Sequence, residues 1–255
     1  LITLGSDFRI EKDFNNVIYG RDIDLYVNRI HCYNPLTNET LAKMADDITD
    51  VTKDILPDQK IDCVAYGCTS GTVAAGYDVI KDKVNLAKPE AKVTTPITSA
   101  IKALNVMGIN KISIFTPYTK TINDSVVSYF EKENVCVNSL TYFDIASDLD
   151  IGKVDEDYLF EVLSKIDLED SDALFVSCTA LPVLSIIDQL EKKLNQDQLT
   201  SSFNRRAYDR KIEDEMERFL RYGTHFSLLL IDADKFKNIN DRYGHAVGDK
   251  CLQEI

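Results

Sequence analysis

Two cysteines of this chain, Cys68 and Cys178, occupy matching positions in two similar stretches of sequence. Asp62–Thr69 aligns with Asp172–Thr179 at an offset of 110 residues, and each stretch is an apolar run that ends in Cys-Thr. A thiolate can remove a proton or attack carbon, and a thiol can deliver a proton. Two such groups on opposite faces of one carbon can therefore invert or isomerise it, which neither could do alone.

The same offset relates two further pairs of apolar runs. Ile2–Ser6 aligns with Ile112–Thr116, and Leu25–Asn28 aligns with Val135–Asn138. Three runs in register indicate a duplication that gives two similar lobes. Because parallel sheets bind ligands at the carboxyl ends of their strands, we expect both Cys-Thr turns to face one cleft.

Short apolar runs alternate with longer amphipathic stretches, as in βαβ units with a mostly parallel sheet. The sequence therefore predicts an α/β fold of two pseudo-symmetric parallel-sheet lobes, about 1–95 and 96–195, followed by a separate segment at 197–255. The predicted strands are 1–4, 24–29, 61–66, 92–94, 111–115, 135–140 and 172–176, and the predicted helices are 40–56, 98–107, 122–133 and 156–166.

Each of the two cysteines also precedes a predicted helix, Thr69–Ile80 or Leu181–Leu194. The positive end of a helix dipole lowers the pKa of a nearby thiol. Hydroxyl groups at the same place, on Thr69, Ser70 and Thr179, could hold a substrate carboxylate. This pattern predicts two reactive thiolates beside a binding site for an anionic group.

The alternative interpretation is that a cysteine is simply a small buried hydrophobe. Only Cys68 and Cys178 share the repeat, so we apply this interpretation to Cys32, Cys63, Cys136 and Cys251. Six cysteines without CxxC spacing favour reduced thiols and a cytoplasmic location. Three scattered histidines argue against a zinc site, and no nucleotide-binding or zinc-peptidase motif is found.

Charge and hydropathy exclude further classes of protein. The formal net charge of −13 argues against nucleic acid as a partner. No apolar run approaches the ~20 residues that span a bilayer, so no membrane association is expected. From residue 197 onward 10 Lys and Arg face 11 Asp and Glu, so nearly all the acidic excess lies in residues 1–196. This change in composition supports a domain boundary near residue 196.

The cysteine motifs carry a family resemblance. Tyr66–Thr72 and Val176–Leu181 resemble the paired cysteine motifs of the aspartate/glutamate racemase superfamily, nearest to its branch of maleate cis–trans isomerases, arylmalonate decarboxylases and ectoine-utilisation relatives. Gly5–Phe14 resembles the first loop of that branch, and Thr116–Tyr118 resembles its second-lobe substrate loop. The resemblance covers about residues 1–195.

The resemblance implies a cofactor-independent isomerase or racemase that acts on a small dicarboxylate-like acid. The presence of both cysteines speaks against a pure decarboxylase, which in this superfamily needs only one. The implied roles are nucleophile or first acid/base for Cys68, opposite-face partner for Cys178, carboxylate binding for Thr69, Ser70 and Thr179, and a substrate hydrogen bond from Tyr118.

The sequence departs from maleate isomerases at Asp7 and Asp148, where the resemblance places asparagine. A carboxylate repels a dianionic diacid unless it is protonated or meets a cation, which leaves room for an amino- or amide-bearing acid. We predict that Asp7 contacts the substrate. The structural alternatives are that Asp7 caps a helix over Phe8–Tyr19 and that Tyr118 is an ordinary buried aromatic.

Residues 197–255 have a different pattern. A charged helix is predicted at Asp209–Arg221 and a strand at Phe226–Ile231, followed by Asp232–Asp241 and Tyr243–Asp249. These stretches resemble the first half of a GGDEF diguanylate cyclase domain. The resemblance implies that Asp232 ligates Mg²⁺ beside GTP, that Phe236 and Lys237 contact phosphate, and that Asn240 and Asp249 read guanine.

The printed sequence ends at Ile255, before the Gly-Gly-Asp/Glu-Glu-Phe hairpin, so we expect the GGDEF-like segment to be inactive, in a truncated or chimeric frame. It begins at Leu1 inside a predicted strand, so we expect earlier residues. The leading hypothesis is an isomerase with a partial cyclase domain. The alternative is a signalling protein whose first domain senses a small acid and regulates cyclic di-GMP synthesis from GTP. Homo-oligomerisation stays open.

Overall fold

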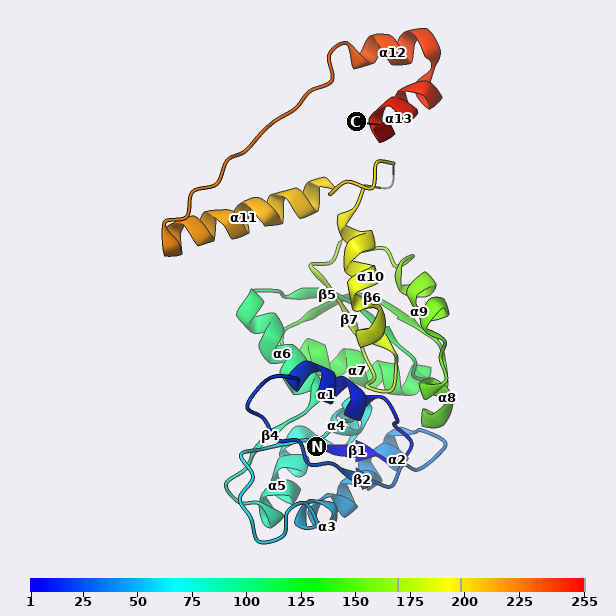
Figure 1. Ribbon diagram of the computed structural model, residues 1–255. Coiled ribbons are helices and arrows are strands. Elements are labelled where there is room, and N and C mark those ends of the chain that lie inside the picture. The colour runs from blue at the N-terminus through cyan, green and yellow to red at the C-terminus, as the bar shows by residue number, and fades with distance from the viewer. Residues whose placement is uncertain (169, 198, 255) are drawn as a thin grey trace. The chain divides into compact units, whose positions relative to one another are not determined.

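The computed structural model describes residues 1–168, 170–197 and 199–254. It divides into two compact units, Leu1–Ile186 and Ile187–Ile255, which we describe separately. The first unit is an α/β structure of two lobes (Figure 1), and its strands are all paired in parallel. This confirms the predicted fold class for that part of the chain.

The first lobe contains four short strands in the spatial order β2-β1-β3-β4. Strands β1 and β2 form one parallel pair and β3 and β4 form another. A parallel bridge between Ile2 and Tyr66 joins the two pairs. The bounds are β1 Ile2–Leu4, β2 Asn28–Ile30, β3 Cys63–Ala65 and β4 Lys92–Thr94.

The second lobe repeats this order as β6-β5-β7, with β5 at Lys111–Thr116, β6 at Cys136–Tyr142 and β7 at Ala173–Val176. The duplication is therefore confirmed in the order and direction of the strands. The register of the strand pairs differs between the two lobes. Ile2 bridges Tyr66, whereas Ile112 pairs with Ala173, and the 110-residue offset would have placed Ile2 opposite Cys63.

Helices connect the strands and cover the sheets, and several start at side-chain caps. Thr37 and Thr95 each form a capping box, which satisfies otherwise unpaired backbone N–H groups. The bounds are α1 Ile10–Ile18, α2 Asn38–Lys43, the 3₁₀ helix η1 Met44–Asp47, α3 Ile48–Lys53, α4 Thr69–Ala75, α5 Tyr77–Ala87, α6 Pro96–Met107, α7 Lys120–Lys132, α8 Asp148–Gly152, α9 Glu156–Leu163 and α10 Val183–Asn195.

Two predicted helices are broken in the structure. The stretch 40–56 is divided into α2, η1 and α3. The stretch 69–80 is interrupted at Gly76, whose φ of 88° ends α4 before α5 begins. Glycine adopts positive φ without a steric penalty, so it permits a sharp change of direction directly after the Cys68 motif.

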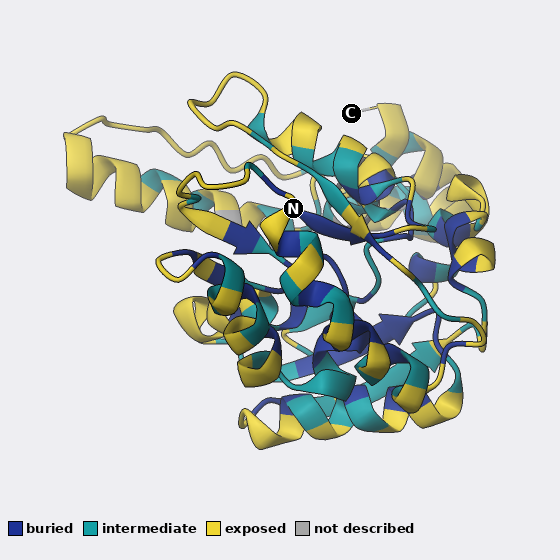
Figure 2. Ribbon diagram, turned by 90° about the horizontal axis from the view of Figure 1, so that it is seen from below, coloured by how far each residue is buried: buried dark blue, intermediate teal, exposed yellow. Residues whose placement is uncertain are grey.

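The core of the first unit lies along the strands, as the buried residues in Figure 2 show. Phe130 and Phe175 meet edge to face with ring centroids 5.0 Å apart, and Phe115 meets Phe143 in the same way at 4.9 Å. Such aromatic pairs add to the stability that burial provides. Both pairs lie in the second lobe. They pack its helices and loops against β5 and β7, and Cys178 follows β7.

The second unit contains α11 at Arg205–Tyr222, α12 at Phe236–Tyr243 and α13 at His245–Glu254. The strand predicted at Phe226–Ile231 is wrong, because this stretch is not paired with any described residue. Leu229 is 81% exposed and Leu230 is 91% exposed. A strand needs a hydrogen-bonded neighbour, and apolar periodicity alone does not supply one.

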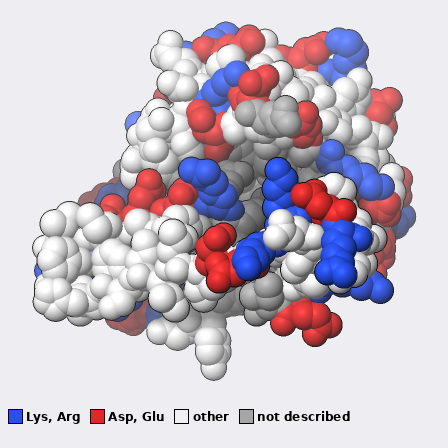
Figure 3. Space-filling model, turned by 90° about the horizontal axis from the view of Figure 1, so that it is seen from above, with Lys and Arg blue, Asp and Glu red and all other residues white. Residues whose placement is uncertain are grey.

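Charges of both signs are mixed on the surface. On the face that Figure 3 shows, Lys and Arg side chains alternate with Asp and Glu side chains. None of the described helices is long and apolar enough to cross a membrane.

We expect Ile114→Ala to destabilise the first unit by about 2–5 kcal/mol, because Ile114 is fully buried in the central strand β5. Urea unfolding followed by circular dichroism measures this change. The control is Val106→Ala at an exposed position of α6, which should change the unfolding free energy by less than about 0.5 kcal/mol. Equal effects of the two substitutions would contradict the described core.

Candidate active site

Cys68 directly precedes α4 and caps it. Its Sγ accepts a hydrogen bond from the backbone N–H of Gly71 at 3.2 Å, and the Ser70 hydroxyl lies 3.8 Å away. The Tyr66 hydroxyl donates a further hydrogen bond to this sulfur. Only 4% of Cys68 is exposed. The predicted placement at a helix N-terminus is correct for this thiol.

Cys178 follows β7 in a different local structure. Helix α10 begins only at Val183, so this thiol does not lie at a helix N-terminus as predicted. The Cys178 backbone instead has a φ of 90°, and the Ala180 backbone N–H and the Tyr118 hydroxyl act to lower the pKa of its thiol. The Pro182 ring, which follows, cannot contribute an N–H group.

Tyr118 lies in the second-lobe loop that follows β5. Its side chain is almost fully buried, and its hydroxyl accepts a hydrogen bond from the Ser177 hydroxyl at 3.2 Å. Burial raises the pKa of Tyr118, and electrostatic interaction with Cys178 and Cys68 raises it further. The Tyr118 hydroxyl is therefore within electrostatic range of both sulfurs.

The expectation of lowered thiol pKa values is wrong. Burial raises the pKa of Cys68 to about 12 and raises the pKa of Cys178 well above its usual value. The Gly71 hydrogen bond favours the Cys68 thiolate but only partly offsets burial, and the negative charge of Asp148 raises both pKa values further. Loss of hydration outweighs a few N–H donors in a dry site. Both resting thiols are therefore protonated at neutral pH.

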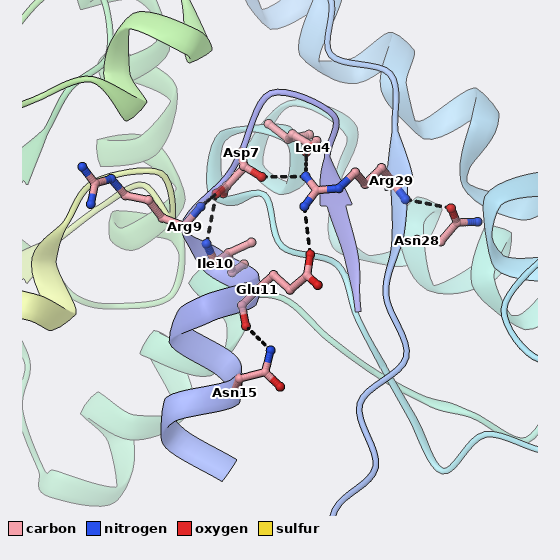
Figure 4. Close-up of polar contacts among 8 residues, drawn as sticks. All are labelled: Leu4, Asp7, Arg9, Ile10, Glu11, Asn15, Asn28 and Arg29. Atoms are coloured by element: carbon pink, nitrogen blue, oxygen red, sulfur yellow. Dashed lines mark hydrogen bonds and ion pairs between the residues drawn. The ribbon is translucent and has the colours of Figure 1, made fainter. Parts of the chain in front are cut away.

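Asp7 joins the first loop to the second lobe. Its Oδ1 accepts the backbone N–H groups of Arg9 at 2.9 Å and Ile10 at 3.0 Å, at the start of α1. Its Oδ2 accepts the Thr179 hydroxyl at 2.9 Å. The helix begins at Ile10 rather than Phe8 and its N-cap residue is Arg9, so Asp7 is not the N-cap residue, although its carboxylate binds the first backbone N–H groups (Figure 4) and lies beside the second cysteine motif.

Asp148 begins α8 from the opposite lobe. Its Oδ2 accepts a short hydrogen bond from the Ser6 hydroxyl, and its backbone N–H donates to Asn34 Oδ1 at 3.2 Å. Burial, and the nearby negative charge of Asp7, raise the pKa of Asp148. The two aspartates, Asp7 and Asp148, therefore interact electrostatically at the junction of the lobes.

The three predicted carboxylate-binding hydroxyls lie at the site. Thr69 and Ser70 are buried in the first turn of α4, next to Cys68. The Thr179 hydroxyl is directed at Asp7 Oδ2 and at the Gly67 carbonyl at 3.1 Å. Two of the three hydroxyls therefore lie with Cys68, while the third closes the contact between the lobes.

Sequence reasoning missed two residues of this cluster, Ser6 and Cys32. The Ser6 hydroxyl contacts both Asp148 and Cys32, and burial raises the pKa of Cys32 to about 11. Cys32 is the second residue after the carboxyl end of β2. The position of Cys32 after a parallel strand could have indicated that it belongs to the site, because side chains that follow such strands lie together at the carboxyl edge of the sheet.

A cavity of about 400 Å³ lies beside Cys178 and Thr179. Apolar side chains of α1 and of the start of α10 form much of its wall, among them Phe14, Val17 and Leu184. Asp13 is the charged residue in the wall. The second cysteine motif is therefore next to a space that a small molecule could enter.

The nucleotide-binding residues predicted in the second unit are only partly brought together. Phe236, Lys237 and Asn240 lie on α12 and Asp249 lies on α13, and the Asn240 and Phe236 side chains pack over Gly248. Asn240 Oδ1 is buried without a hydrogen-bond partner in the described part of the chain.

Asp232 lies outside this contact, in the extended stretch before α12. No three His, Cys, Asp or Glu side chains of the described residues are grouped so that they could hold a metal ion. As arranged, these described residues do not form a magnesium site. The Mg²⁺ ion at Asp232 and GTP beside it stay predictions.

We expect Cys68 to resist alkylation by iodoacetamide in the folded protein. At pH 9 about three-quarters of an ordinary cysteine with a pKa of about 8.5 is thiolate, but only about one in a thousand at a pKa of about 12. Burial raises the pKa of Cys68 in the folded protein above its value in the unfolded chain. The contribution of this thiol to folding stability is therefore present below about pH 8.5 and is lost as the pH rises towards 12. Peptide mass spectrometry at each pH gives the rate for each cysteine.

The exposed cysteines Cys63 and Cys136 are controls within the same molecule. Both should react at the ordinary rate, and Cys68 should join them in urea. Alkylation of Cys68 at the rate of Cys136 in the folded protein would contradict the buried, protonated thiol.

Comparisons with known proteins match the two parts of the chain separately. A maleate isomerase of Geobacillus stearothermophilus is 27% identical over 175 residues, which cover 66% of this chain and 69% of that protein. The family model for the diguanylate cyclase GGDEF domain matches residues 194–255. Diguanylate cyclase DgcM of Escherichia coli K12 is 43% identical over 65 residues, which cover 26% of this chain and 16% of that protein.

Solved structures match the first part of the chain. A cysteine-to-serine variant of the Nocardia farcinica maleate cis–trans isomerase, with a covalently bound succinylcysteine intermediate, has a TM-score of 0.68 at 17% identity, over 75% of this chain and 82% of that one. A double variant of arylmalonate decarboxylase in its liganded form has a TM-score of 0.64 at 18% identity, over 76% and 82%. The N-terminal part of this chain thus has the fold of maleate isomerases and arylmalonate decarboxylases, and it is joined to a GGDEF-domain segment at residues 194–255.

Proposed function

We propose that the first unit is a cofactor-independent isomerase or racemase that acts on a small acid with two carboxyl-type groups. The observation that carries this proposal is a pair of thiols from the two lobes, the buried Cys68 and the partly buried Cys178, which both interact electrostatically with the Tyr118 hydroxyl. A buried structural cysteine needs no such partner. The covalent succinylcysteine in the Nocardia farcinica relative supports thiol chemistry in this fold.

The chemistry is a proton transfer across one carbon. One cysteine, as thiolate, takes the proton from the α-carbon, so that an S–H bond forms, the C–H bond breaks and the electron pair moves into the adjacent carboxylate. The other cysteine then gives its proton to the opposite face of the carbon and becomes the thiolate. Atoms and charge balance, and the roles reverse in the next turnover.

Isomerisation of a double bond uses the same pair of thiols. One thiolate adds to an alkene carbon and the other cysteine protonates the neighbouring carbon. Rotation about the new single bond, followed by return of that proton and loss of the thiolate, gives the other isomer. Thr69 and Ser70 would hold a carboxylate beside Cys68, and the buried Tyr118 would orient the Cys178 sulfur.

We expect Cys68→Ser and Cys178→Ser each to reduce turnover by about 10²–10⁴-fold, because each removes one proton carrier. Proton NMR in D₂O on the reduced full chain, with maleate, aspartate, glutamate, methylmalonate-type diacids and N-acetylated diamino acids, measures deuterium uptake and cis–trans conversion. Cys63→Ser, at an exposed position, is the matched control. No conversion of any of these compounds by folded protein would sink the proposal.

A second candidate function is signalling, favoured by the GGDEF match at residues 194–255. The first unit would then bind a small acid without converting it and would change nucleotide binding in the attached segment. We expect in that case that the acid changes the affinity of the full chain for GTP in titration calorimetry, and that Cys68→Ser with Cys178→Ser leaves this change intact. An acid-independent GTP affinity would exclude this function.

A further inference from the structure

Tyr66 is a buried aromatic residue of the first cysteine motif, and only 1% of it is exposed. Its backbone lies between two strands of the first lobe, because it bridges Ile2 and its N–H donates to the Thr94 carbonyl oxygen at 2.9 Å. The Cys68 N–H donates in turn to the Tyr66 carbonyl oxygen at 3.0 Å. Tyr66 therefore fixes the backbone that leads into the first thiol.

The Tyr66 hydroxyl lies beside the Cys68 sulfur. A Cβ atom added to Gly71 would lie 2.8 Å from the hydroxyl oxygen of Tyr66 and 2.9 Å from Cys68 Sγ, closer than a methyl group can approach either atom. The Gly71 N–H donates to the same sulfur at 3.2 Å. The hydroxyl, the N–H group and the sulfur therefore share one small space, which exists because residue 71 has no side chain.

The Tyr66 hydroxyl keeps its proton in this space. Burial raises the pKa of Tyr66 well above its usual value, and the interaction with Cys68 raises it further. A buried tyrosine O–H group needs an acceptor, because no water satisfies it there. The neighbouring sulfur is such an acceptor, so the hydroxyl is a neutral donor to the first thiol.

The second lobe has its aromatic hydroxyl at a different position. The 110-residue offset pairs Tyr66 with Val176, and it pairs Tyr118 with Phe8, so neither tyrosine is repeated. Each thiol nevertheless interacts with one buried tyrosine that comes from its own lobe. The duplication alone does not account for these two hydroxyls, whereas a need of both thiols for a donor does.

We propose that Tyr66 is a positioning residue for the reaction, whose hydroxyl, together with the Gly71 N–H, holds the Cys68 sulfur and stabilises its thiolate. This inference rests on the proposed function and gives Tyr66 no contact with the substrate. The thiolate forms when Cys68 gives its proton to the substrate carbon. A hydrogen bond to a charged acceptor is stronger than one to a neutral acceptor, so the contribution of Tyr66 grows as the proton leaves.

Other ionisable groups interact electrostatically with the Cys68 sulfur. They are Asp148 of α8, Cys32 after β2, Tyr118 after β5 and Cys178 after β7. The charge of Asp148 opposes the thiolate, whereas the Gly71 N–H favours it. Replacement of Tyr66 by phenylalanine leaves all these groups in place, so its effect reports on the hydroxyl alone.

The first test needs no turnover. We expect Tyr66→Phe in the reduced full chain to slow alkylation of Cys68 by iodoacetamide about tenfold at pH 10, because the thiolate loses a donor. Peptide mass spectrometry measures the rate. Tyr77→Phe is the matched control and should leave the rate unchanged, because the Tyr77 hydroxyl donates to the Val93 carbonyl oxygen at 3.0 Å. Unchanged or faster alkylation in Tyr66→Phe would overturn the inference.

A second variant changes the hydroxyl in the opposite direction. Tyr66→3-fluorotyrosine, introduced at this position alone, has a more acidic hydroxyl of nearly the same size, and a more acidic hydroxyl is a stronger donor. It should speed alkylation of Cys68, and it replaces Tyr66→Phe should that variant fail to fold. An unaltered rate in a folded 3-fluorotyrosine variant would count against the proposed donor.

The kinetics distinguish a positioning role from a merely structural one. Tyr66→Phe should lower kcat about tenfold or more and leave KM within about twofold, because the hydroxyl acts through Cys68. The rise of kcat with pH should move to higher pH, since the thiolate becomes harder to form. In a Cys68→Ser background the same substitution should cost no further activity. An additive loss, or a change in KM alone, would contradict the role.

The two proposals fail in different ways. Slower alkylation of Cys68 in Tyr66→Phe, with no turnover of any diacid by the unaltered chain, would keep the donor and reject the isomerase. Turnover that Tyr66→Phe leaves intact, with an unchanged rate of alkylation, would keep the isomerase and reject the role of Tyr66.

Discussion

The structure depends on a buried carboxylate, Asp7, that ties the two lobes together beside the second cysteine motif. Its oxygens fix the first turn of α1 on one side and the Thr179 hydroxyl on the other. Thr179 is the residue after Cys178, so the position of the second thiol relative to the first lobe is set through this contact. Arg29 fixes the same loop through the Asp7 carbonyl.

Burial of this cleft has two opposed effects. Exclusion of water makes every remaining interaction stronger, which suits a reaction that moves charge between two sulfurs and a carbon. The same exclusion keeps Cys68 and Cys178 protonated. Thiols that are kept protonated in this way are protected from adventitious oxidation, which follows thiolate character and exposure.

Much of the fold could be predicted because the same sequence pattern occurs twice, at an offset of 110 residues. The repeat located both cysteines and the similarity of the two lobes, and β4 has the predicted bounds. The thiol pKa values could not be predicted, because they depend on how deeply tertiary packing buries each sulfur. Cys32 was dismissed for lacking a repeat partner, and the stretch Phe226–Ile231 was predicted as a strand from apolar residues alone. Pairing and burial are properties of the whole chain, which a local pattern does not contain.

The backbone at Cys178 has a φ of 90°, a conformation that glycine adopts freely and other residues adopt under strain. The backbone geometry therefore does not favour a side chain at this position. A mutation to glycine would relieve the strain while it removes one of the two thiols. The scaffold would thus tolerate the loss of this thiol without added backbone strain.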